Sequence, residues 1–365
     1  DEAAKGIRVI GPNCFGIYCP QSGLTIPPGP DFSRKSGPVA FISQSGGLAA
    51  DFVLMGMWLG FGFSKLISFG NGADLRETDL IEYFAEDPET KIIALYMEGI
   101  EDGDRFFRVL KAAAAKKPVI IYKGGLSEAG NRAVASHTAS MGGSRIIWES
   151  LIRQAGAVQV HNFEELCYAC LAFAFLPLRY YRGMTVLGGG GAQGVAACDV
   201  AEANGMFLPP LEGPVYDAVY EALPKPGSSA ANPVDVANPH VPPQTLKTVL
   251  IEAAKDERID IQVQVSLFYH FKSLIKRLRL DSIEAAMPLD EYGEAAREAW
   301  AKTDKPVVVV LPDRRQGIDD LDVETLIRKA RKEFLDRGVP VFPTLQDALQ
   351  AIRRVSDYHR RREKK

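Results

Sequence analysis

Short, mostly apolar runs alternate with amphipathic stretches along most of this chain. The first such runs are residues 39–43, 64–69, 92–97 and 119–122, and each leads into a glycine-containing turn. A strand with no polar side is buried on both faces, which is typical of a parallel sheet covered by helices on both faces. The alternation therefore predicts an α/β fold of the flavodoxin-like, doubly wound type. Its functional edge is expected where strands end and helices begin.

The same alternation starts again after residues 177–183. Further expected strands cover residues 184–187, 259–266 and 306–311. A chain of 365 residues is also longer than one ordinary core can fill. We therefore expect two flavodoxin-like, doubly wound parallel-sheet domains in tandem, over residues 37–178 and 183–357.

The two ends of the chain do not fit these domains. A strand expected at residues 7–10 would need neighbours from upstream, and three prolines within residues 27–30 indicate a stiff, extended connection. We expect residues 1–36 to be the end of a preceding domain followed by a linker. Residues 358–365 are rich in arginine and lysine and are expected to form a solvated basic tail.

Composition and charge limit the partners and the cellular compartment that we expect for this protein. A formal net charge of −3 gives no electrostatic reason to expect nucleic acid or an anionic membrane as a partner. No apolar run is long enough to span a bilayer, and five cysteines are few and odd in number, as in a reducing compartment. We expect a cytoplasmic protein. Cys167 and Cys170 have the spacing of a redox or zinc pair, but they fall on an expected core helix, where small apolar residues are the simpler interpretation.

One histidine lies in a long stretch of small residues. Residues 123–144 are expected to form a loop of about twenty residues, and loops of this length in compact domains are usually functional. His137 lies within it. A neutral imidazole is a competent nucleophile near pH 7 and can carry a phosphoryl group. The alternative is a surface histidine without a chemical role.

Two glycine-rich turns precede expected helices, and unpaired N–H groups at a helix N-terminus form a ready anion site. One turn contains Ser45, Gly46 and Gly47, and the other spans residues 189–194. The second lacks the spacing of a dinucleotide fingerprint and an acidic partner for a ribose, which favours a cradle for one phosphate. Two cradles and one histidine predict a phosphoryl-binding pocket between the domains.

One carboxylate is a candidate for the same site. Glu98 follows an expected strand and could accept a hydrogen bond from one ring nitrogen of His137, leaving the other nitrogen free to attack. It could equally be a solvated acid at a helix start. Asp235 could cap a helix or a turn.

Several segments, taken in order, resemble the α-subunit side of the succinyl-CoA synthetase superfamily. A further set narrows the resemblance to the NDP-forming acyl-CoA synthetases, which include ADP-forming acetyl-CoA synthetase. The segments are residues 11–16, 43–47, 70–74 and 97–99 for the superfamily, and residues 127–130, 136–144 and 232–235 for the narrower group.

The resemblance implies two flavodoxin-like domains that work with a CoA-binding Rossmann domain and an ATP-grasp module, fused or on a β-subunit. It implies that His137 is a phosphohistidine supported by Glu98, and that Asn13 and Cys14 lie near the CoA thiol. The implied phosphate-binding residues are Ser45, Gly46, Gly47, Gly190, Gly191, Ala192, Gln193 and Gly194.

The reaction implied by the resemblance joins a small carboxylic acid to CoA, converting ATP or GTP with Mg²⁺ into a nucleoside diphosphate and phosphate. Most of the CoA-binding domain and the whole nucleotide-binding module are expected to be missing from this chain, which should be part of an oligomer. Two alternatives remain open. One is a non-catalytic module that senses CoA or phosphate, and the other is a relative that uses acyl-CoA formation to start a lyase reaction.

Overall fold

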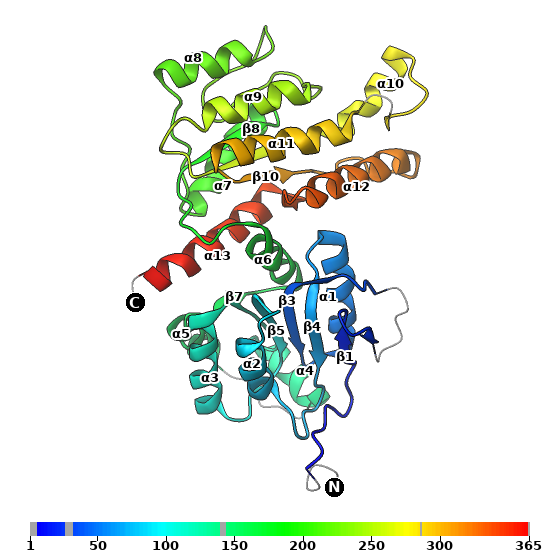
Figure 1. The fold of residues 1–365 in the computed structure, drawn as a ribbon, viewed down its shortest axis with the longest axis vertical. Coiled ribbons are helices and arrows are strands. Elements are labelled where there is room, and N and C mark those ends of the chain that lie inside the picture. The colour runs from blue at the N-terminus through cyan, green and yellow to red at the C-terminus, as the bar shows by residue number, and fades with distance from the viewer. Residues whose placement is uncertain (1–5, 26–31, 139–143, 285–286, 364–365) are drawn as a thin grey trace. The chain divides into compact units, whose positions relative to one another are not determined.

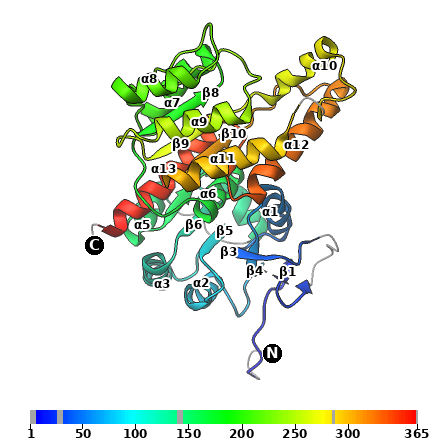
Figure 2. The ribbon, with the colours of Figure 1, turned by 45° about the horizontal axis from the view of Figure 1, so that its top comes forward.

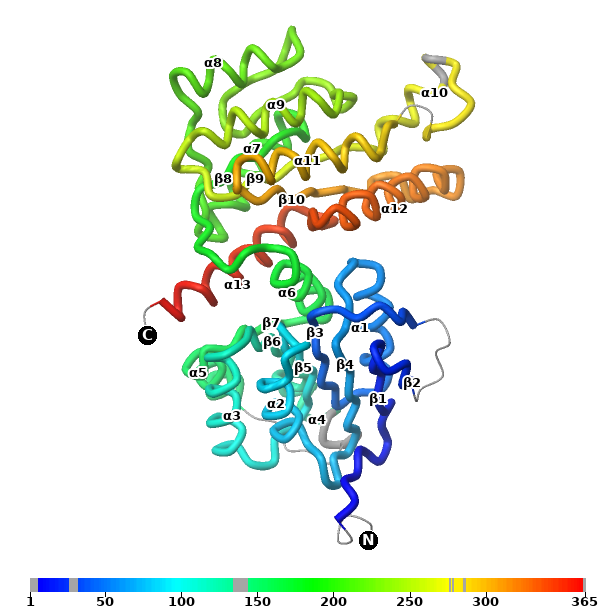
Figure 3. The backbone as a smooth tube through the Cα atoms, in the orientation of Figure 1, coloured from blue at the N-terminus to red at the C-terminus, as the bar shows by residue number. Residues whose placement is uncertain are grey.

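The computed structural model describes residues 6–25, 32–138, 144–284 and 287–363, with the backbone alone at 134–138, 276 and 278. The chain divides into two compact units. The first comprises residues 1–174 together with 357–365, and the second comprises residues 175–356. Figure 1 labels their elements, and the tube in Figure 3 allows the chain to be followed from one element to the next.

The first unit is built on a seven-stranded sheet in the order β2-β1-β4-β3-β5-β6-β7. The strands from β3 to β7 are parallel to their neighbours. Counted along the chain, these five have the spatial order 2-1-3-4-5, which is the flavodoxin-like order. The predicted fold class is confirmed for this unit. The strands are β1 (Gly16–Cys19), β2 (Leu24–Thr25), β3 (Ser36–Ser43), β4 (Phe63–Ser68), β5 (Ile92–Met97), β6 (Val119–Lys123) and β7 (Val158–Val160).

Helices cover both faces of this sheet. On one face, α2, α3 and α5 bury a continuous cluster that includes Ile42, Leu95 and Trp148. On the other face, the rings of Phe52 in α1 and Phe163 in α6 lie 6.3 Å apart. The helices are α1 (Gly46–Leu59), α2 (Glu77–Glu86), α3 (Gly103–Lys116), α4 (Glu128–Thr138), α5 (Arg145–Ala155) and α6 (Phe163–Phe175).

Helix α6 is the core helix that the sequence predicts. Cys167 and Cys170 are completely buried in it. Burial raises the pKa of both thiols. Neither sulfur is therefore a ready thiolate, and the interpretation as small apolar residues is the one that fits.

The strand predicted at residues 7–10 is wrong. These residues form no strand, and the segment is held instead by Asp74, whose Oδ2 accepts from the N–H of Val9 at 2.7 Å and whose carboxylate pairs with Arg8. The strand lies a few residues later, because β1 pairs antiparallel with β4 and β2 pairs with β1. Residues 16–25, which we assigned to a tail and linker, thus extend the first sheet at its β4 edge (Figure 3).

The second unit contains a four-stranded parallel sheet in the order β11-β10-β9-β8. Val234 adds a single parallel bridge on the free side of β8, through Leu187. With this bridge counted as a reduced strand, the order is again 2-1-3-4-5. The strands are β8 (Met184–Gly188), β9 (Ile261–Val265), β10 (Val307–Val310) and β11 (Val341–Phe342).

Helices also cover this second sheet. α9, α11 and α12 lie side by side in the turned view of Figure 2, while Arg353 of α13 donates to the carbonyl of Asn204 at the end of α7. The sequence analysis did not anticipate α8 or α10. The elements are α7 (Gly191–Ala203), α8 (Gly213–Ala222), α9 (Pro243–Ala253), η2 (Phe268–Phe271), α10 (Lys272–Leu278), α11 (Leu289–Thr303), η4 (Ile318–Asp320), α12 (Leu321–Asp336) and α13 (Leu345–Glu363).

The basic tail predicted from residue 358 is also wrong. Helix α13 continues through Glu363. Tyr358 is completely buried, and its hydroxyl donates to the carbonyl of Ala114 at 3.0 Å. Because this contact belongs to the first unit, α13 begins in one unit and ends in the other.

Candidate functional site

The switch point of the first sheet lies between β3 and β5, where the chain connections leave toward opposite sides. Open α/β sheets bind ligands outside the carboxyl ends of strands at such a point. Gln44 follows β3, and its Oε1 accepts from the N–H of Glu98 at 2.7 Å and from that of Gly99 at 3.2 Å. The two strand ends are thus joined by a side chain that is 7% exposed.

Helix α1 begins at this switch point, at the residue that the sequence predicts. Ser45 is its N-cap, and the Ser45 Oγ accepts from the N–H of Leu48 at 3.3 Å. The N–H groups of Gly46 and Gly47 belong to the first turn, where the helix offers them no acceptor. A Cβ added to Gly47 would meet nothing within 4 Å. The start of α1 therefore has the geometry of an anion site.

Glu98 is held by residues of β5 and β6. The Tyr96 hydroxyl donates to Glu98 Oε1 at 3.1 Å. The Lys123 Nζ donates to the carbonyl of Glu98 at 2.6 Å and to that of Gly124 at 2.7 Å. Burial lowers the pKa of the Lys123 ammonium, whereas the charge of Glu98 acts in the opposite direction. Burial and the Glu98 carboxylate raise the pKa of Tyr96, so its hydroxyl remains a donor at neutral pH.

The segment that follows β6 is not the uninterrupted loop that the sequence predicts. Only the four residues 124–127 separate β6 from α4. The Ser127 Oγ accepts from the N–H of Gly130 at 3.0 Å, as an N-cap does. Three alanines favour the helix and outweigh its one glycine. The backbone of His137 lies in the last turn of α4, and its side chain lies outside the described part of the chain.

The turn that contains Asn13 and Cys14 packs on the loop after β4. The Asn13 side-chain amide donates to Asn71 Oδ1 at 3.3 Å. Phe15 follows Cys14 directly. Its backbone N atom lies 3.2 Å from the position that a Cβ added to Gly46 would occupy. The structure therefore brings the predicted CoA-proximal residues next to the start of α1, within one unit.

The second predicted cradle forms the start of α7. Gly188, Gly189 and Gly190 all have positive φ, and Gly190 is the N-cap of α7. A Cβ on Gly188 would lie 2.3 Å from the carbonyl oxygen of Val265 in β9, so only glycine fits there. The residues predicted to bind phosphate make up this N-cap and the first turn. They are Gly190, Gly191, Ala192, Gln193 and Gly194.

A cavity of about 240 Å³ adjoins this start of α7. Asp235 and Ser229 are polar residues that line it, and Cys198 and Val195 line it from α7. The Asp235 Oδ1 accepts from the N–H of Ala237 at 2.8 Å. Of the two roles that the sequence left open for Asp235, the structure shows the turn cap.

A larger cavity of about 440 Å³ lies at the carboxyl ends of β9 and β10. Its walls are mostly apolar, with Val265 and Val310 among them, and Gln193 borders it from α7. Asp313 and Arg314, in the segment after β10, supply charge at its border. Sequence analysis missed these two residues.

Sequence analysis also missed Gln44, Tyr96 and Lys123. Each is a polar side chain at or near the carboxyl end of an otherwise apolar strand. That position is the signal that could have found them, because the carboxyl ends of parallel strands meet at one edge.

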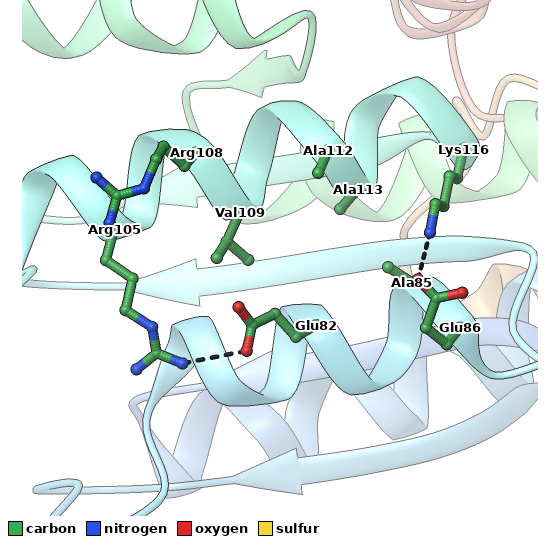
Figure 4. A pocket seen from close by; sticks show the side chains of 9 residues that line it. All are labelled: Glu82, Ala85, Glu86, Arg105, Arg108, Val109, Ala112, Ala113 and Lys116. Carbon is green, nitrogen blue, oxygen red and sulfur yellow. Dashed lines mark hydrogen bonds and ion pairs between the residues drawn. The ribbon is translucent and has the colours of Figure 1, made fainter.

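A third cavity, of about 470 Å³, lies between α2 and α3 (Figure 4). Arg105 pairs with Glu82 at 3.1 Å across it, and Lys116 pairs with Glu86. Lys116 and Glu86 end their helices, and helices in a doubly wound sheet run opposite to its strands. This cavity therefore extends toward the amino edge, away from Gln44 and the switch point.

Among the described residues, no helix has the length and apolar character that crossing a membrane requires. The same residues contain no group of three or more His, Cys, Asp or Glu side chains placed to hold a metal ion.

Comparisons with known proteins agree with this architecture. The model of the succinyl-CoA ligase like flavodoxin domain matches residues 36–173. The alpha subunit of ADP-forming acetate–CoA ligase II from Pyrococcus furiosus is 38% identical over 354 residues, which cover 95% of this chain and 70% of that protein. ADP-forming acetate–CoA ligase I from Archaeoglobus fulgidus is 35% identical over 265 residues, covering 71% of this chain but 37% of that protein.

A solved structure is similar over almost the whole chain. It is the dinucleotide forming acetyl-coenzyme A synthetase 1 of Ca. Korarchaeum cryptofilum in complex with phosphate and ADP, with 29% identity and a TM-score of 0.78. The match covers 99% of this chain and 73% of that one. Since a relative with 38% identity is covered over more than two thirds of its length, the chain belongs to the family of ADP-forming acetate–CoA ligases.

Proposed function

We propose that this chain is the part of an NDP-forming acyl-CoA synthetase that carries the phosphoryl group on His137. The histidine takes a phosphoryl group that originates from ATP or GTP and passes it to the carboxylate of a small acid. The thiol of CoA then attacks the acyl phosphate, forming the thioester and releasing inorganic phosphate. The family to which the chain belongs, and the names of its relatives, support this reaction class.

The observation that carries the proposal is the meeting of three elements at the switch point. These features lie at the carboxyl ends of β3, β5 and β6. They are the N-terminus of α1, Glu98 with its hydrogen-bond partners, and the start of the segment that leads to α4. Phosphoryl transfer requires positioning and charge stabilisation more than covalent chemistry from the protein. N–H groups at a helix N-terminus supply that stabilisation at no cost in reorganisation.

Glu98 is the proposed partner of His137. A carboxylate that accepts from one imidazole nitrogen fixes the tautomer and leaves the other nitrogen to attack phosphorus. It also stabilises the positive charge that the ring gains when it is phosphorylated.

The remaining predicted residues receive roles in the same reaction. The first turn of α7, residues 191–194, is proposed as a second helix N-terminus that holds phosphate together with that of α1. Asn13 and Cys14 are proposed to lie near the thiol of CoA. Their place next to the start of α1 supports this role, because the thiol must reach the acyl phosphate.

We also propose that the nucleotide binds mainly on a partner module or subunit of an oligomer. The chain spans 70% of one alpha-subunit relative and 37% of a longer one. Mg²⁺ bound with the nucleotide would neutralise charge on its phosphates. The relatives are named as ligases, which supports a synthetase over a regulatory module or a lyase.

The test is histidine phosphorylation in the complete enzyme, assembled with its nucleotide-binding partner. Incubation with radiolabelled ATP or GTP and Mg²⁺ should give an acid-labile, base-stable label that acid plus CoA discharges. The label should be lost in His137→Asn and kept in His161→Asn, which changes an exposed-loop histidine before α6. An unlabelled wild-type assembly, or a label that survives in His137→Asn, would overturn the proposal.

A further inference from the structure

Two lysines flank strand β6. Lys117 lies two residues before its first residue, Lys123 is its last residue, and each lysine donates to two backbone carbonyls. Lys117 donates to the carbonyls of Phe84 at 2.7 Å and Asp87 at 2.6 Å. These carbonyls end α2, where a cation complements the helix dipole. Lys117 therefore has a structural explanation.

Lys123 lacks that explanation. Its two acceptors, the carbonyls of Glu98 and Gly124, belong to no helix end. A buried ammonium is costly unless it is hydrogen-bonded or faces an opposite charge. The structure shows no ion pair between Lys123 and a described carboxylate, but the Lys123 Nζ lies 2.6 Å from the carbonyl oxygen of Glu98. The charge of Lys123 is thus placed beside Glu98.

Tyr96 approaches Glu98 from its own strand. Its hydroxyl donates to Glu98 Oε1 at 3.1 Å, and its ring centroid lies 5.1 Å from that of Tyr122. A Cβ on Gly124 would lie 2.8 Å from the Tyr96 hydroxyl. The lack of a side chain at Gly124 therefore makes room for this hydroxyl, directly next to Lys123.

Glu98 is consequently held at three atoms by three neighbours. Gln44 binds its N–H, Lys123 binds its carbonyl, and Tyr96 binds its carboxylate. A surface acid at a helix start would need none of these contacts. A carboxylate that must be positioned to within a fraction of an ångström requires contacts of this kind.

We propose that Tyr96 and Lys123 are positioning residues for Glu98. Tyr96 fixes the carboxylate by a hydrogen bond, and Lys123 fixes the loop and stabilises the ionised carboxylate by its charge. This inference rests on the proposed function, in which Glu98 supports His137. Neither residue touches the reacting phosphorus; both act through Glu98.

The titratable groups that face Glu98 from the described elements are few. β5 contributes Tyr96, and β6 contributes Lys123. The turn after β3 contributes Gln44, which does not titrate. A donor and a cation both favour the charged form of a carboxylate.

The test uses Tyr96→Phe and Lys123→Met in the complete enzyme. The rate of phosphohistidine formation in a single turnover is measured from about pH 5 to pH 9, together with the melting temperature. Each variant should be slower by about tenfold at neutral pH, because a hydrogen bond or charge contact to an ionised group is lost. The acid limb of its pH profile should also move to higher pH, which a purely structural role would not cause.

Matched controls come from β6 and from the C-cap of α3 just before it. Tyr122→Phe removes the hydroxyl of the neighbouring ring, and Lys117→Met removes the lysine that precedes β6. Both controls should keep the wild-type pH profile, whatever Lys117→Met does to stability. If Lys123→Met fails to fold, Tyr96→Phe still tests the proposal, because this variant removes only the hydroxyl and leaves the aromatic ring in place.

The outcomes separate the two proposals. An unlabelled wild-type enzyme would overturn the proposed function. A labelled wild type whose label is lost in Glu98→Gln, but whose rate and pH profile are unchanged in Tyr96→Phe and Lys123→Met, would overturn this inference alone. Equal shifts in the test and control variants would do the same.

Discussion

At the scale of single residues, Gly70 determines how closely the turn with Asn13 approaches the loop after β4. Gly70 has a φ of 56°, and a Cβ there would lie 2.3 Å from the carbonyl oxygens of Pro12 and Asn13. We expect Gly70→Ala to lower the free energy of unfolding by about 2 kcal/mol or more, through backbone strain and collision. Denaturant unfolding measures the change.

The control for this prediction is Gly103→Ala. Gly103 begins α3, and a Cβ there meets nothing within 4 Å. Alanine should be neutral or slightly stabilising at such a position. A Gly70→Ala variant as stable as this control would show that the close approach of the turn is not required.

Asp87 gives a residue-scale prediction about pH. Burial alone would raise the pKa of its carboxyl, but hydrogen bonds from Lys65, Thr90 and the N–H of Glu89 outweigh burial and lower it. A carboxyl with a lowered pKa in the folded state stabilises the fold above its ordinary pKa of about 3.9, and this stability is lost as the pH falls through the lower, folded value.

We therefore expect Asp87→Asn to lose about 2 kcal/mol of stability at neutral pH. The difference from the wild type should shrink as the pH falls below about 4. Glu89→Gln, which also removes a partner of Lys65 but at a more exposed site, should change stability by no more than about 0.5 kcal/mol. Urea unfolding at several pH values measures both variants. A constant deficit for Asp87→Asn at every pH would contradict the argument.

At the scale of elements, α4 depends on its N-cap. Ser127 accepts from the N–H of Gly130, so Ser127→Ala should destabilise the helix by about 1 kcal/mol. Hydrogen exchange of the α4 amides should become about fivefold faster. Ser144→Ala is the matched control, because Ser144 is the N-cap of α5 but its side chain makes no capping hydrogen bond. Equal effects of the two variants on their helices would contradict the role given to Ser127.

At the scale of the whole molecule, α13 connects the two units along the chain. Tyr358 is buried in the first unit, with its ring centroid 5.6 Å from that of Phe173. Tyr358→Ala should cost about 3–5 kcal/mol, as removal of other buried aromatic side chains does. Arg360→Ala, at an exposed position two residues later, should cost less than about 1 kcal/mol. Thermal unfolding checks both, and a small effect of Tyr358→Ala would support a solvated tail after all.

The sequence by itself determined the parallel strands, because a run such as residues 92–97 has no polar face and must be covered on both sides. It also determined where α1 and α7 begin, since serine and glycine are favoured at the residue that precedes a helix. These features depend on neighbours in the chain.

Only the tertiary structure decided the remainder. Whether residues 128–138 form a loop or a helix depends on small differences in free energy. These come from the helix propensities of alanine and glycine and from one N-cap hydrogen bond, and a pattern of small residues does not reveal them. Whether Tyr358 is exposed depends on a partner 244 residues away. The contacts of Glu98 likewise come from three separate segments, with Gln44 just after β3, Tyr96 in β5 and Lys123 in β6. Contacts between distant segments follow from the order of strands in the sheet, which local sequence does not specify.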